Sequence, residues 1–320
     1  MTIVSPTWFL LCILGLNYLT TDHIFDYLHG NSTWRSHGVK MAAWFMSAEM
    51  LVNWLLLCTV RSAYTDSECN RHKRVLYEHG YPQYKMAGME YDELQEKADK
   101  IDIEEWSVIT HRYDNLVKRM AYPYWAWKPC VVCQYYKPPR CHHCPVCDCC
   151  VIKRDHHCFF AMQCVGLNNQ RFFVVFNFWA VLLTFFATPQ LFVYMFAVVW
   201  PLMAATDIFL PWTVISFCLG WTEFYVLAVT FQCWSVVFFF LLSSAFLCEQ
   251  ISCIGKGTTP YENSNYKRMT VRPYRSLREK YARVFGHRLT WINFVLPLHW
   301  LSEPGDDGVL WTWRKEKPIF

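Results

Sequence analysis

The segment at residues 130–164, CVVCQYYKPPRCHHCPVCDCCVIKRDHHCFFAMQC, decides how this chain is organised. It contains nine of the sixteen cysteines and four of the twelve histidines. Two Cys-x-x-Cys pairs stand out in it, Cys130/Cys133 and Cys144/Cys147. Each pair offers a metal ion two thiolates, which is half of a tetrahedral zinc shell. The segment is therefore predicted to form a small domain around metal ions.

Two zinc sites need four further ligands, which the later histidines and cysteines of the segment can supply. We assign one ion to Cys130, Cys133, His143 and Cys150, and the other ion to Cys144, Cys147, His157 and Cys164. The spacing fixes only the two Cys-x-x-Cys pairs, so the partition of the later ligands is an inference. Cys149 competes with Cys150 as a ligand, and Cys141 is needed by neither site.

The run Asp155-His156-His157-Cys158 leaves one cysteine, Cys158, that neither zinc site needs. A thiol attacks as a thiolate, an adjacent imidazole can take its proton, and a carboxylate can orient that imidazole. Cys158, His156 and Asp155 are therefore candidates for a nucleophile, a base and an orienting acid. The alternative is a structural zinc module whose remaining cysteines have no chemical role.

The full spacing, Cys-x2-Cys-x9-His-Cys-x2-Cys-x2-Cys-x4-Asp-His-His-Cys-x5-Cys, resembles the cysteine-rich domain of the DHHC protein S-acyltransferases, the palmitoyltransferases. The resemblance covers residues 130–171 and includes Pro138-Pro139-Arg140, Cys164-Val165-Gly166 and Asn169. It implies that Cys158 is acylated by acyl-CoA while His156, oriented by Asp155, acts as its base. It also supports the zinc partition given above.

Two positions beside Cys158 depart from that family. Phe159-Phe160 stands where the family usually has Pro-Trp, and Gln163 stands where it usually has Asn. The replacements stay large and apolar, or keep an amide. We therefore expect a changed acyl-chain fit or rate more than a loss of the chemistry.

The composition indicates a membrane protein. Of the 320 residues, 54% are hydrophobic and only 18% are charged, which is too apolar for a soluble domain of this size. Apolar runs at residues 3–19, 41–60, 172–200 and 222–247 predict four transmembrane helices. The expected fold class is an α-helical polytopic membrane protein with a small cytosolic two-zinc cysteine-rich domain. In the second run Glu49 and Asn53 share a helix face, and we expect a hydrogen bond to another helix more than a place in an acyl cavity.

Charge and cysteine chemistry set the expected topology. Sixteen of the 30 Lys and Arg residues lie in residues 61–171 and twelve lie after residue 247, which favours a cytosolic location for both regions. Zinc-binding thiols must also stay reduced, as they do on the cytosolic side. We expect a first transmembrane hairpin (1–60), a cytosolic helical linker (61–129), the zinc-binding DHHC domain (130–171), a second transmembrane pair (172–248) and a cytosolic tail (249–320).

Four weaker patterns lie outside these segments. Residues 90–105 combine eight acidic residues with an apolar stripe typical of a helix, and Asn31-Ser32-Thr33 is a glycosylation sequon. The run 258–262, Thr-Thr-Pro-Tyr-Glu, resembles the family's Thr-Thr-x-Glu motif with one residue too many, which leaves its register open. Residues 277–285 predict a basic amphipathic helix on the anionic cytosolic leaflet.

These patterns predict a membrane enzyme that transfers an acyl chain from acyl-CoA, expected to be palmitoyl-CoA, through a Cys158 thioester to cysteines of proteins at the cytosolic face. Its cofactors would be two structural zinc ions, and its partners acyl-CoA, protein substrates and membrane lipids, with no nucleic acid. We expect an endomembrane location, ER or Golgi, rather than the plasma membrane. The alternatives are a catalytically inactive zinc-bearing membrane adaptor, and a zinc hydrolase or redox protein whose metal shell opens.

Overall fold

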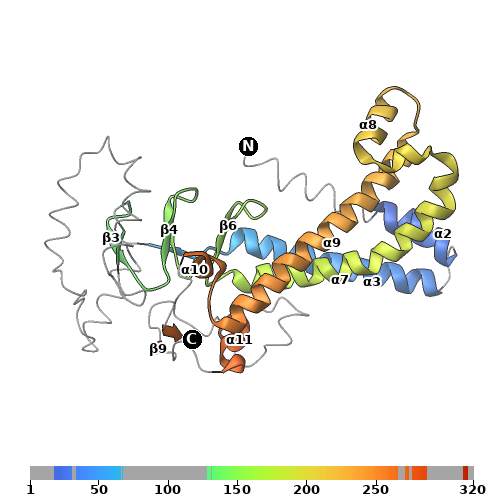
Figure 1. Cartoon of the computed structure of the whole chain (residues 1–320). Coiled ribbons are helices and arrows are strands. Elements are labelled where there is room, and N and C mark those ends of the chain that lie inside the picture. The colour runs from blue at the N-terminus through green and yellow to red at the C-terminus, as the bar shows by residue number, and fades with distance from the viewer. Residues whose placement is uncertain are drawn as a thin grey trace, which may run out of the picture. The chain divides into compact units, whose positions relative to one another are not determined.

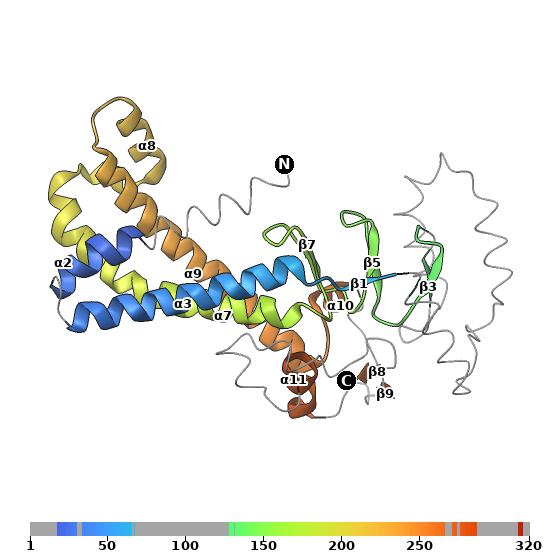
Figure 2. The same cartoon turned by 180° about the vertical axis from the view of Figure 1, so that it is seen from behind.

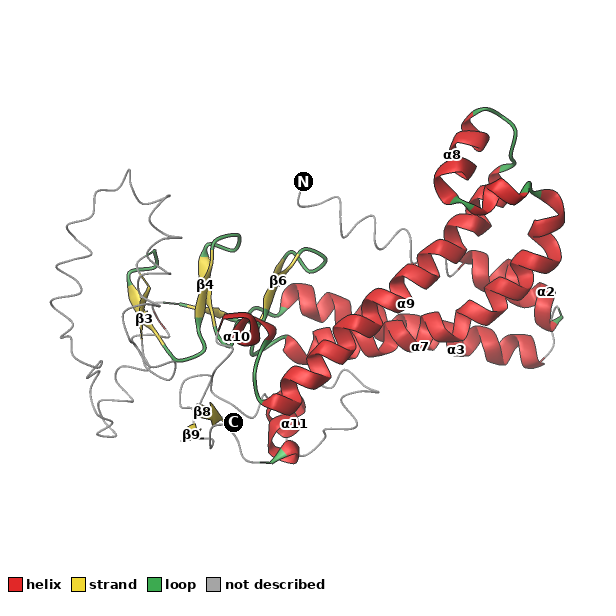
Figure 3. Cartoon of the chain, viewed as in Figure 1, coloured by secondary structure: helices red, strands yellow, loops and turns green. Residues whose placement is uncertain are grey.

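The computed structural model describes residues 18–30, 34–65, 67, 128–130, 132–265, 271–273, 276–286 and 313–315. The sequon, the acidic segment at 90–105 and residues 3–17 of the predicted first span lie outside these residues. The chain divides into a helical unit (Met1–Leu57, Arg171–Ser252 and Ile292–Leu298) and a cysteine-rich unit (Cys58–Gln170, Cys253–Trp291 and His299–Phe320). Helices make up the described part of the first unit, and short strands occur in the second (Figures 1 and 3).

Three long helices dominate the helical unit: α3 (Trp34–Thr59), α7 (Gln170–Tyr194) and α9 (Phe224–Lys256). Helix α7 continues through the π-helical turn η3 (Met195–Val199) and the 3-10 turn η4 (Trp200–Leu202). Within the described residues, the segments long and apolar enough to cross a membrane are Trp34–Thr59, Gln170–Leu202 and Phe224–Lys256. The chain is therefore an integral membrane protein. The three segments contain most of the spans predicted at 41–60, 172–200 and 222–247.

The described segment before α3 is helical. It forms the π-helical turn η1 (Leu19–Ile24) and the helix α2 (Phe25–His29), and the side chains of Ile24 and Phe25 are fully buried. Asp26 accepts hydrogen bonds of 2.8 Å from both Ser36 Oγ and Lys40 Nζ. These bonds hold the polar first turns of α3, which begins at Trp34, before the span predicted at residues 41–60. Figure 2 shows α2 near the N-terminal end of α3.

The core of the helical unit joins α2, α3, α7 and α9 in one apolar cluster. Aromatic edge-to-face contacts link these helices, including Phe45–Trp179 between α3 and α7 and Phe173–Phe246 between α7 and α9. Within the described residues, the side-chain amide of Asn53 donates to the Glu49 carbonyl of its own helix at 2.8 Å. Between α7 and α9 the chain forms the 3-10 turn η5 (Ala205–Ile208) and the helix α8 (Leu210–Cys218).

The cysteine-rich unit contains a structural repeat of three antiparallel hairpins within residues 128–165. The hairpins are β2 (Lys128–Cys130) with β3 (Tyr135–Lys137), β4 (His142–Cys144) with β5 (Cys149–Val151), and β6 (His156–Cys158) with β7 (Gln163–Val165). Each hairpin begins 14 residues after the previous one. The turns end alike, since Gln134, Asp148 and Met162 all adopt left-handed backbone angles with φ of 55°, 49° and 53°.

The residues that follow α3 are bound to the residues that precede α7. Val60 O accepts hydrogen bonds from the side-chain amides of Gln163 (3.1 Å) and Asn169 (3.0 Å). Ser62 Oγ donates to Asn169 Oδ1 at 3.1 Å. The two-residue strand β1 (Ala63–Tyr64) then pairs with β5. The third hairpin is thereby held at the point where the chain leaves α3 and enters α7.

The C-terminal part of this unit contains α10 (Pro260–Asn265), α11 (Leu277–Phe285) and the strand pair β8 (Val271–Pro273) and β9 (Trp313–Lys315). The predicted helix at 277–285 is present, and Ser276 caps it by accepting from Glu279 N at 3.2 Å. Only part of its apolar face is open for the expected lipid surface, because Val284 and Phe285 are buried in the protein whereas Leu277 is 63% exposed.

Candidate active site and metal centres

Two groups of four metal-binding side chains lie in the hairpins. Each residue offers one ligand atom, and within each group these atoms lie within 4.8 Å of one another. The groups are Cys130, Cys133, His143 and Cys150, and Cys144, Cys147, His157 and Cys164. Both clusters could hold a metal ion, and their membership is the partition expected from the sequence.

The distances inside the groups fit zinc. A tetrahedral ion with Zn–S bonds of about 2.3 Å holds two sulfur ligands about 3.8 Å apart. The Sγ–Sγ distances are 3.8 Å for Cys133–Cys150 and 3.7 Å for Cys147–Cys164. The imidazoles present Nδ1 to the sulfurs, at 3.3 Å for His143–Cys133 and 3.2 Å for His157–Cys147. These donor sets are those of closed structural zinc sites.

Strand register explains why Cys150 and not Cys149 joins the first group. His143 lies directly opposite Cys150 in the β4–β5 pair, and His157 lies directly opposite Cys164 in the β6–β7 pair. Opposite residues of an antiparallel pair present their side chains on the same face, whereas Cys149 points to the other face. Each ion would therefore join the turn cysteines of one hairpin to a His–Cys pair of the next.

Cys158 occupies a position that holds a metal ligand in the first two hairpins. It follows Cys144 by 14 residues, as Cys144 follows Cys130, but Ala161 stands where the second turn cysteine would be. In the residues that the structure describes, Cys158 belongs to neither ligand group. Its side chain is buried, with 6% of its surface exposed. The repeat therefore leaves one thiol beside the second metal cluster and outside its shell.

His156 and Asp155 lie next to this thiol. Asp155 is fully buried, and its backbone N–H bonds to Val165 O at 2.9 Å. Its Oδ1 lies 3.6 Å from His156 Nδ1, which is electrostatic contact without a close hydrogen bond. Burial opposes protonation of His156, but Asp155 and Cys158 outweigh this effect and raise the pKa of the imidazole to about 10. The three residues can therefore stabilise an imidazolium beside a thiolate.

The Thr-Thr-Pro-Tyr-Glu run, residues 258–262, forms a capping box at the start of α10 and bonds to the residue before Asp155. Thr259 Oγ1 accepts from Glu262 N at 3.2 Å, and Glu262 Oε2 accepts from Thr259 N at 2.8 Å. Thr259 Oγ1 also donates to Arg154 O, at 3.1 Å. Thr259 rather than Thr258 is therefore the residue bonded next to Asp155, which settles the register that the sequence left open.

Tyr261 of this run contacts the side chains of His142 and Arg154. Its ring centroid lies 4.3 Å from that of His142, and the Arg154 guanidinium lies 5.1 Å from it. Burial opposes the charge on Arg154, but Cys164 and Cys144 outweigh this effect and raise the pKa of the guanidinium. The cation thus lies beside the thiolates of the second metal cluster.

The sequence analysis missed the role of Arg140. This residue of the Pro-Pro-Arg run is buried in an ion pair with Glu262. Its Nη2 also donates to the carbonyl of Gly257 at 3.2 Å. Arg140 and Glu262 both lie in runs that the sequence analysis quotes, but no spacing rule links residues that lie so far apart in the sequence.

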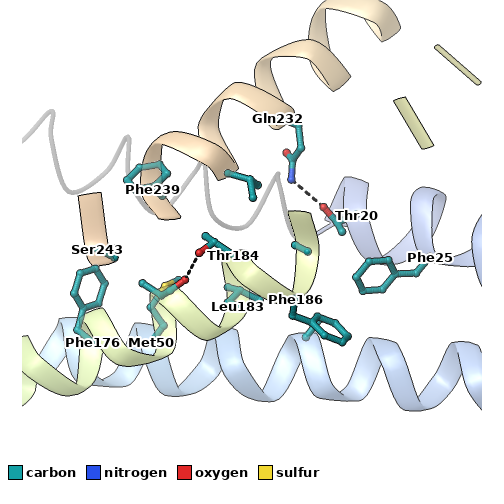
Figure 4. A pocket seen from close by; sticks show the side chains of 14 residues that line it. Thr20, Phe25, Met50, Phe176, Leu183, Thr184, Phe186, Gln232, Phe239 and Ser243 are labelled. Carbon is teal, nitrogen blue, oxygen red and sulfur yellow. Dashed lines mark hydrogen bonds between the residues drawn. The ribbon is translucent and has the colours of Figure 1, made fainter. Parts of the chain in front are cut away.

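The helical unit contains an apolar cavity between its helices. Residues of η1, α2, α3, α7 and α9 line it, and Thr20, Thr184, Gln232 and Ser243 are its polar members (Figure 4). Gln232 Nε2 donates to Thr20 Oγ1 at 2.9 Å, which joins α9 to η1 at the cavity wall (Figure 4). Glu49 does not line this cavity. The lining suits a hydrocarbon chain more than a polar ligand.

Comparison with known proteins agrees with this geometry. The family model described as DHHC palmitoyltransferase matches residues 126–267, a range that holds both ligand groups and Cys158. The chain therefore carries a domain of the DHHC palmitoyltransferase family, as the resemblance in the sequence indicated.

Individual relatives match over shorter stretches. Probable protein S-acyltransferase 12 of Arabidopsis thaliana is 47% identical over 55 residues, 17% of this chain and 19% of that protein. Palmitoyltransferase ZDHHC20-B of Danio rerio is 55% identical over 47 residues, 15% of each chain. Palmitoyltransferase ZDHHC2 of Homo sapiens is 49% identical over 57 residues, 18% of this chain and 16% of that protein. The matched stretch thus spans 19% or less of the length of these three relatives.

Proposed function

We propose that this protein is a protein S-acyltransferase, which moves a long acyl chain from acyl-CoA to cysteines of protein substrates through a thioester on Cys158. The observation that carries the proposal is the position of Cys158. It is buried beside His156 and Asp155, in a hairpin held by metal ligands, yet it is outside both ligand groups. A thiol in that setting is available for covalent catalysis.

The reaction has two halves that share the same groups. In the resting site the proton of Cys158 lies on His156, and in the first half the Cys158 thiolate attacks the carbonyl carbon of the acyl-CoA thioester. The bond from that carbon to the CoA sulfur breaks, and CoA leaves as a thiol with the proton from His156. In the second half a substrate cysteine gives its proton to His156, attacks the Cys158 thioester, and Cys158 leaves as a thiol. Asp155 favours the protonated imidazole in both halves.

The two ligand groups would hold structural zinc. With four protein donors for each ion, zinc would link consecutive hairpins and so hold Cys158 in place. Because the shells are complete, we assign no chemical step to the metal, which argues against the hydrolase and redox alternatives.

The remaining expectations concern the membrane. We propose four transmembrane helices, including one at residues 3–19, with the zinc domain and both termini in the cytosol and an endomembrane location. The division into segments 1–60, 61–129, 130–171, 172–248 and 249–320 follows from that topology. The acyl chain of palmitoyl-CoA would lie among the spanning helices, and the apolar cavity of the helical unit supports this assignment. The proposed protein substrates carry cysteines at the cytosolic face.

The test is acylation of the purified protein. Protein in detergent is incubated with labelled palmitoyl-CoA beside Cys158→Ala, and neutral hydroxylamine is then added. We expect label on the unchanged protein that hydroxylamine removes, and none on Cys158→Ala. The matched control is Cys141→Ser, which removes a buried cysteine outside both ligand groups and should keep the label. Absence of label from protein that still binds two zinc ions would favour the inactive adaptor.

A further inference from the structure

The connection between the spanning helices α7 and α9 has an inverted distribution of polar and apolar side chains. Within residues 201–224 the buried side chains are all polar, namely Asp207, Thr213 and Ser216. The exposed side chains of helix α8 include the large apolar ones of Trp212, Val214, Ile215 and Phe217. A helix that packs on a protein in water has the opposite arrangement, with its apolar residues inside. The distribution therefore indicates that α8 is surrounded by an apolar medium.

The polar groups of this connection are satisfied within it. Thr213 Oγ1 donates to the carbonyl of Asp207, and Ser216 Oγ shares a hydrogen bond of 2.5 Å with Thr222 Oγ1. Asp207 Oδ2 accepts from Ala204 N at 3.1 Å. The structure describes the whole connection, and no buried side-chain N or O atom in it lacks a hydrogen-bond partner. A hydrocarbon environment demands such internal satisfaction, because lipid chains offer no hydrogen bonds.

Helix α8 also continues the lipid-facing surface of α9. Trp234 and Phe238 are 49% and 58% exposed on α9, which is one of the membrane-crossing segments. Trp234 Nε1 donates to Ile208 O at 2.9 Å, two residues before α8 begins. A groove of about 340 Å³ is lined by Phe209 and Pro211 from the start of α8 and by Trp234 and Phe238 from α9. The apolar surface of α9 therefore extends onto α8 across this groove.

The length and position of α8 fit a helix that enters the bilayer without crossing it. Its nine residues rise about 14 Å, which is less than half of a hydrocarbon core of about 30 Å. In Figures 1 and 2 α8 lies at the side of α9 and reaches less far than α2 towards that end of the helical unit. The side of a bundle of spanning helices is the region that lipid surrounds.

We propose that residues 205–221 form a membrane-embedded connection, in which the exposed face of α8 contacts phospholipid acyl chains of the leaflet where the α7 span ends. The partner is hydrocarbon because residues 208–222 contain no charged side chain that a polar partner could pair with. Trp212 and Trp221 suit the boundary between acyl chains and headgroups, where Trp is enriched. The embedding goes beyond the proposed acyl transfer and does not depend on it.

The test places a photoreactive side chain on the exposed face of α8. Ile215→p-benzoylphenylalanine is made in the full-length protein, reconstituted in phosphatidylcholine nanodiscs without acyl-CoA and irradiated. The positive control is the same change at Leu241, an exposed residue of the α9 span. The negative control is the same change at Val146, which is exposed in the β4–β5 turn beside the exposed Asp148. We expect a mass increase of one phosphatidylcholine at positions 215 and 241 and none at position 146.

Three results would overturn the embedding. The first is a cross-linked dimer at position 215, which would assign the surface to a second copy of this chain. The second is no phospholipid adduct at position 215 while position 241 gains one, and the third is an equal adduct at all three positions. Each variant is checked by size-exclusion chromatography, and Val214→p-benzoylphenylalanine replaces the Ile215 variant if that variant aggregates. Because no acyl-CoA is present, a negative result here is separate from a failure of acyl transfer.

Discussion

Arg140 and Glu262 form a bidentate ion pair across 122 residues of sequence, with Nε–Oε1 at 2.7 Å and Nη2–Oε2 at 2.9 Å. Both side chains are 1% exposed. Glu262 also closes the capping box with Thr259, whose hydroxyl bonds to the carbonyl of Arg154. The pair and the capping box therefore fasten the segment after α9 to the turn before β4 and to the segment that leads into Asp155.

Breaking this pair should be costly, because it leaves one buried charge without its counterion. We expect Arg140→Met or Glu262→Gln alone to destabilise the fold by about 3–5 kcal/mol. The double variant Arg140→Met/Glu262→Met should lose less than the two single losses added together. Thermal unfolding in detergent measures both. Arg283→Gln is the control, since its pair with Glu279 spans 3.8 Å on a partly exposed helix face and should cost about 0.3–0.5 kcal/mol. An equal loss of stability in Arg283→Gln and in the Arg140 or Glu262 variants would contradict the role given to the buried ion pair.

Neighbouring cysteines of β5 should differ in metal binding. Cys150 lies opposite His143 in its ligand group, whereas Cys149 points to the other face of the hairpin. We expect Cys150→Ser to lower the zinc content from two ions per chain towards one and Cys149→Ser to leave it unchanged. Elemental analysis of the purified variants gives the count. Loss of an ion from Cys149→Ser would reverse the assignment.

Gly166 is a position where a single methyl group does not fit. A Cβ there would lie 2.6 Å from Ile152 O and 2.8 Å from Ser62 Cβ. Since the first of these atoms belongs to the backbone, Gly166→Ala should destabilise the protein by about 1–3 kcal/mol. Gly38→Ala is the matched control, because it lies in helix α3 with nothing within 4 Å of the added atom, and it should be neutral or stabilise by about 0.5–1 kcal/mol. Comparison of the two thermal unfolding midpoints decides the point.

Tyr261 should be needed for its ring and not for its hydroxyl. The ring contacts both His142 and the guanidinium of Arg154. We expect Tyr261→Phe to retain the unfolding midpoint, whereas Tyr261→Ala loses the aromatic and cation contacts, worth about 0.5–1.5 kcal/mol each. The rate of acyl-enzyme formation is followed in parallel, because Arg154 directly precedes Asp155. A Phe variant as impaired as the Ala variant would assign the role to the hydroxyl.

The pH dependence of acylation should report on Asp155. Burial lowers the pKa of His156, and Asp155 with Cys158 raises it to about 10, so the imidazole is protonated at neutral pH and loses its proton only as the pH approaches that value. Asp155→Asn removes a negative charge that favours the imidazolium, which lowers the pKa of His156. The alkaline limb of the pH–rate profile for acyl-enzyme formation should then move to lower pH. An unmoved limb with a reduced rate would indicate that Asp155 only orients the ring.

Local patterns in the sequence determined the chemistry of this protein and its membrane character. The Cys-x-x-Cys pairs, the run from Asp155 to Cys158 and the apolar segments each express a rule that acts over a few residues. Ligand type follows from thiolate and imidazole chemistry, and a membrane-crossing helix follows from length and apolarity. For that reason the ligand groups found in the structure, and the spans within the described residues, match the predictions made from spacing and composition.

Only the tertiary structure decided which residues support that chemistry. Strand register selected Cys150 over Cys149, and the capping box selected Thr259 over Thr258. The Arg140–Glu262 ion pair, and the hydrogen bond from the Asn169 side chain to Val60 O, join residues that are more than 100 positions apart. The 14-residue repeat places Cys158 at the position where Cys130 and Cys144 are metal ligands, and it places Ala161 at the position of Cys133 and Cys147. Such contacts depend on how the chain packs, because burial and hydrogen-bond geometry are satisfied in space and leave no fixed spacing in the sequence.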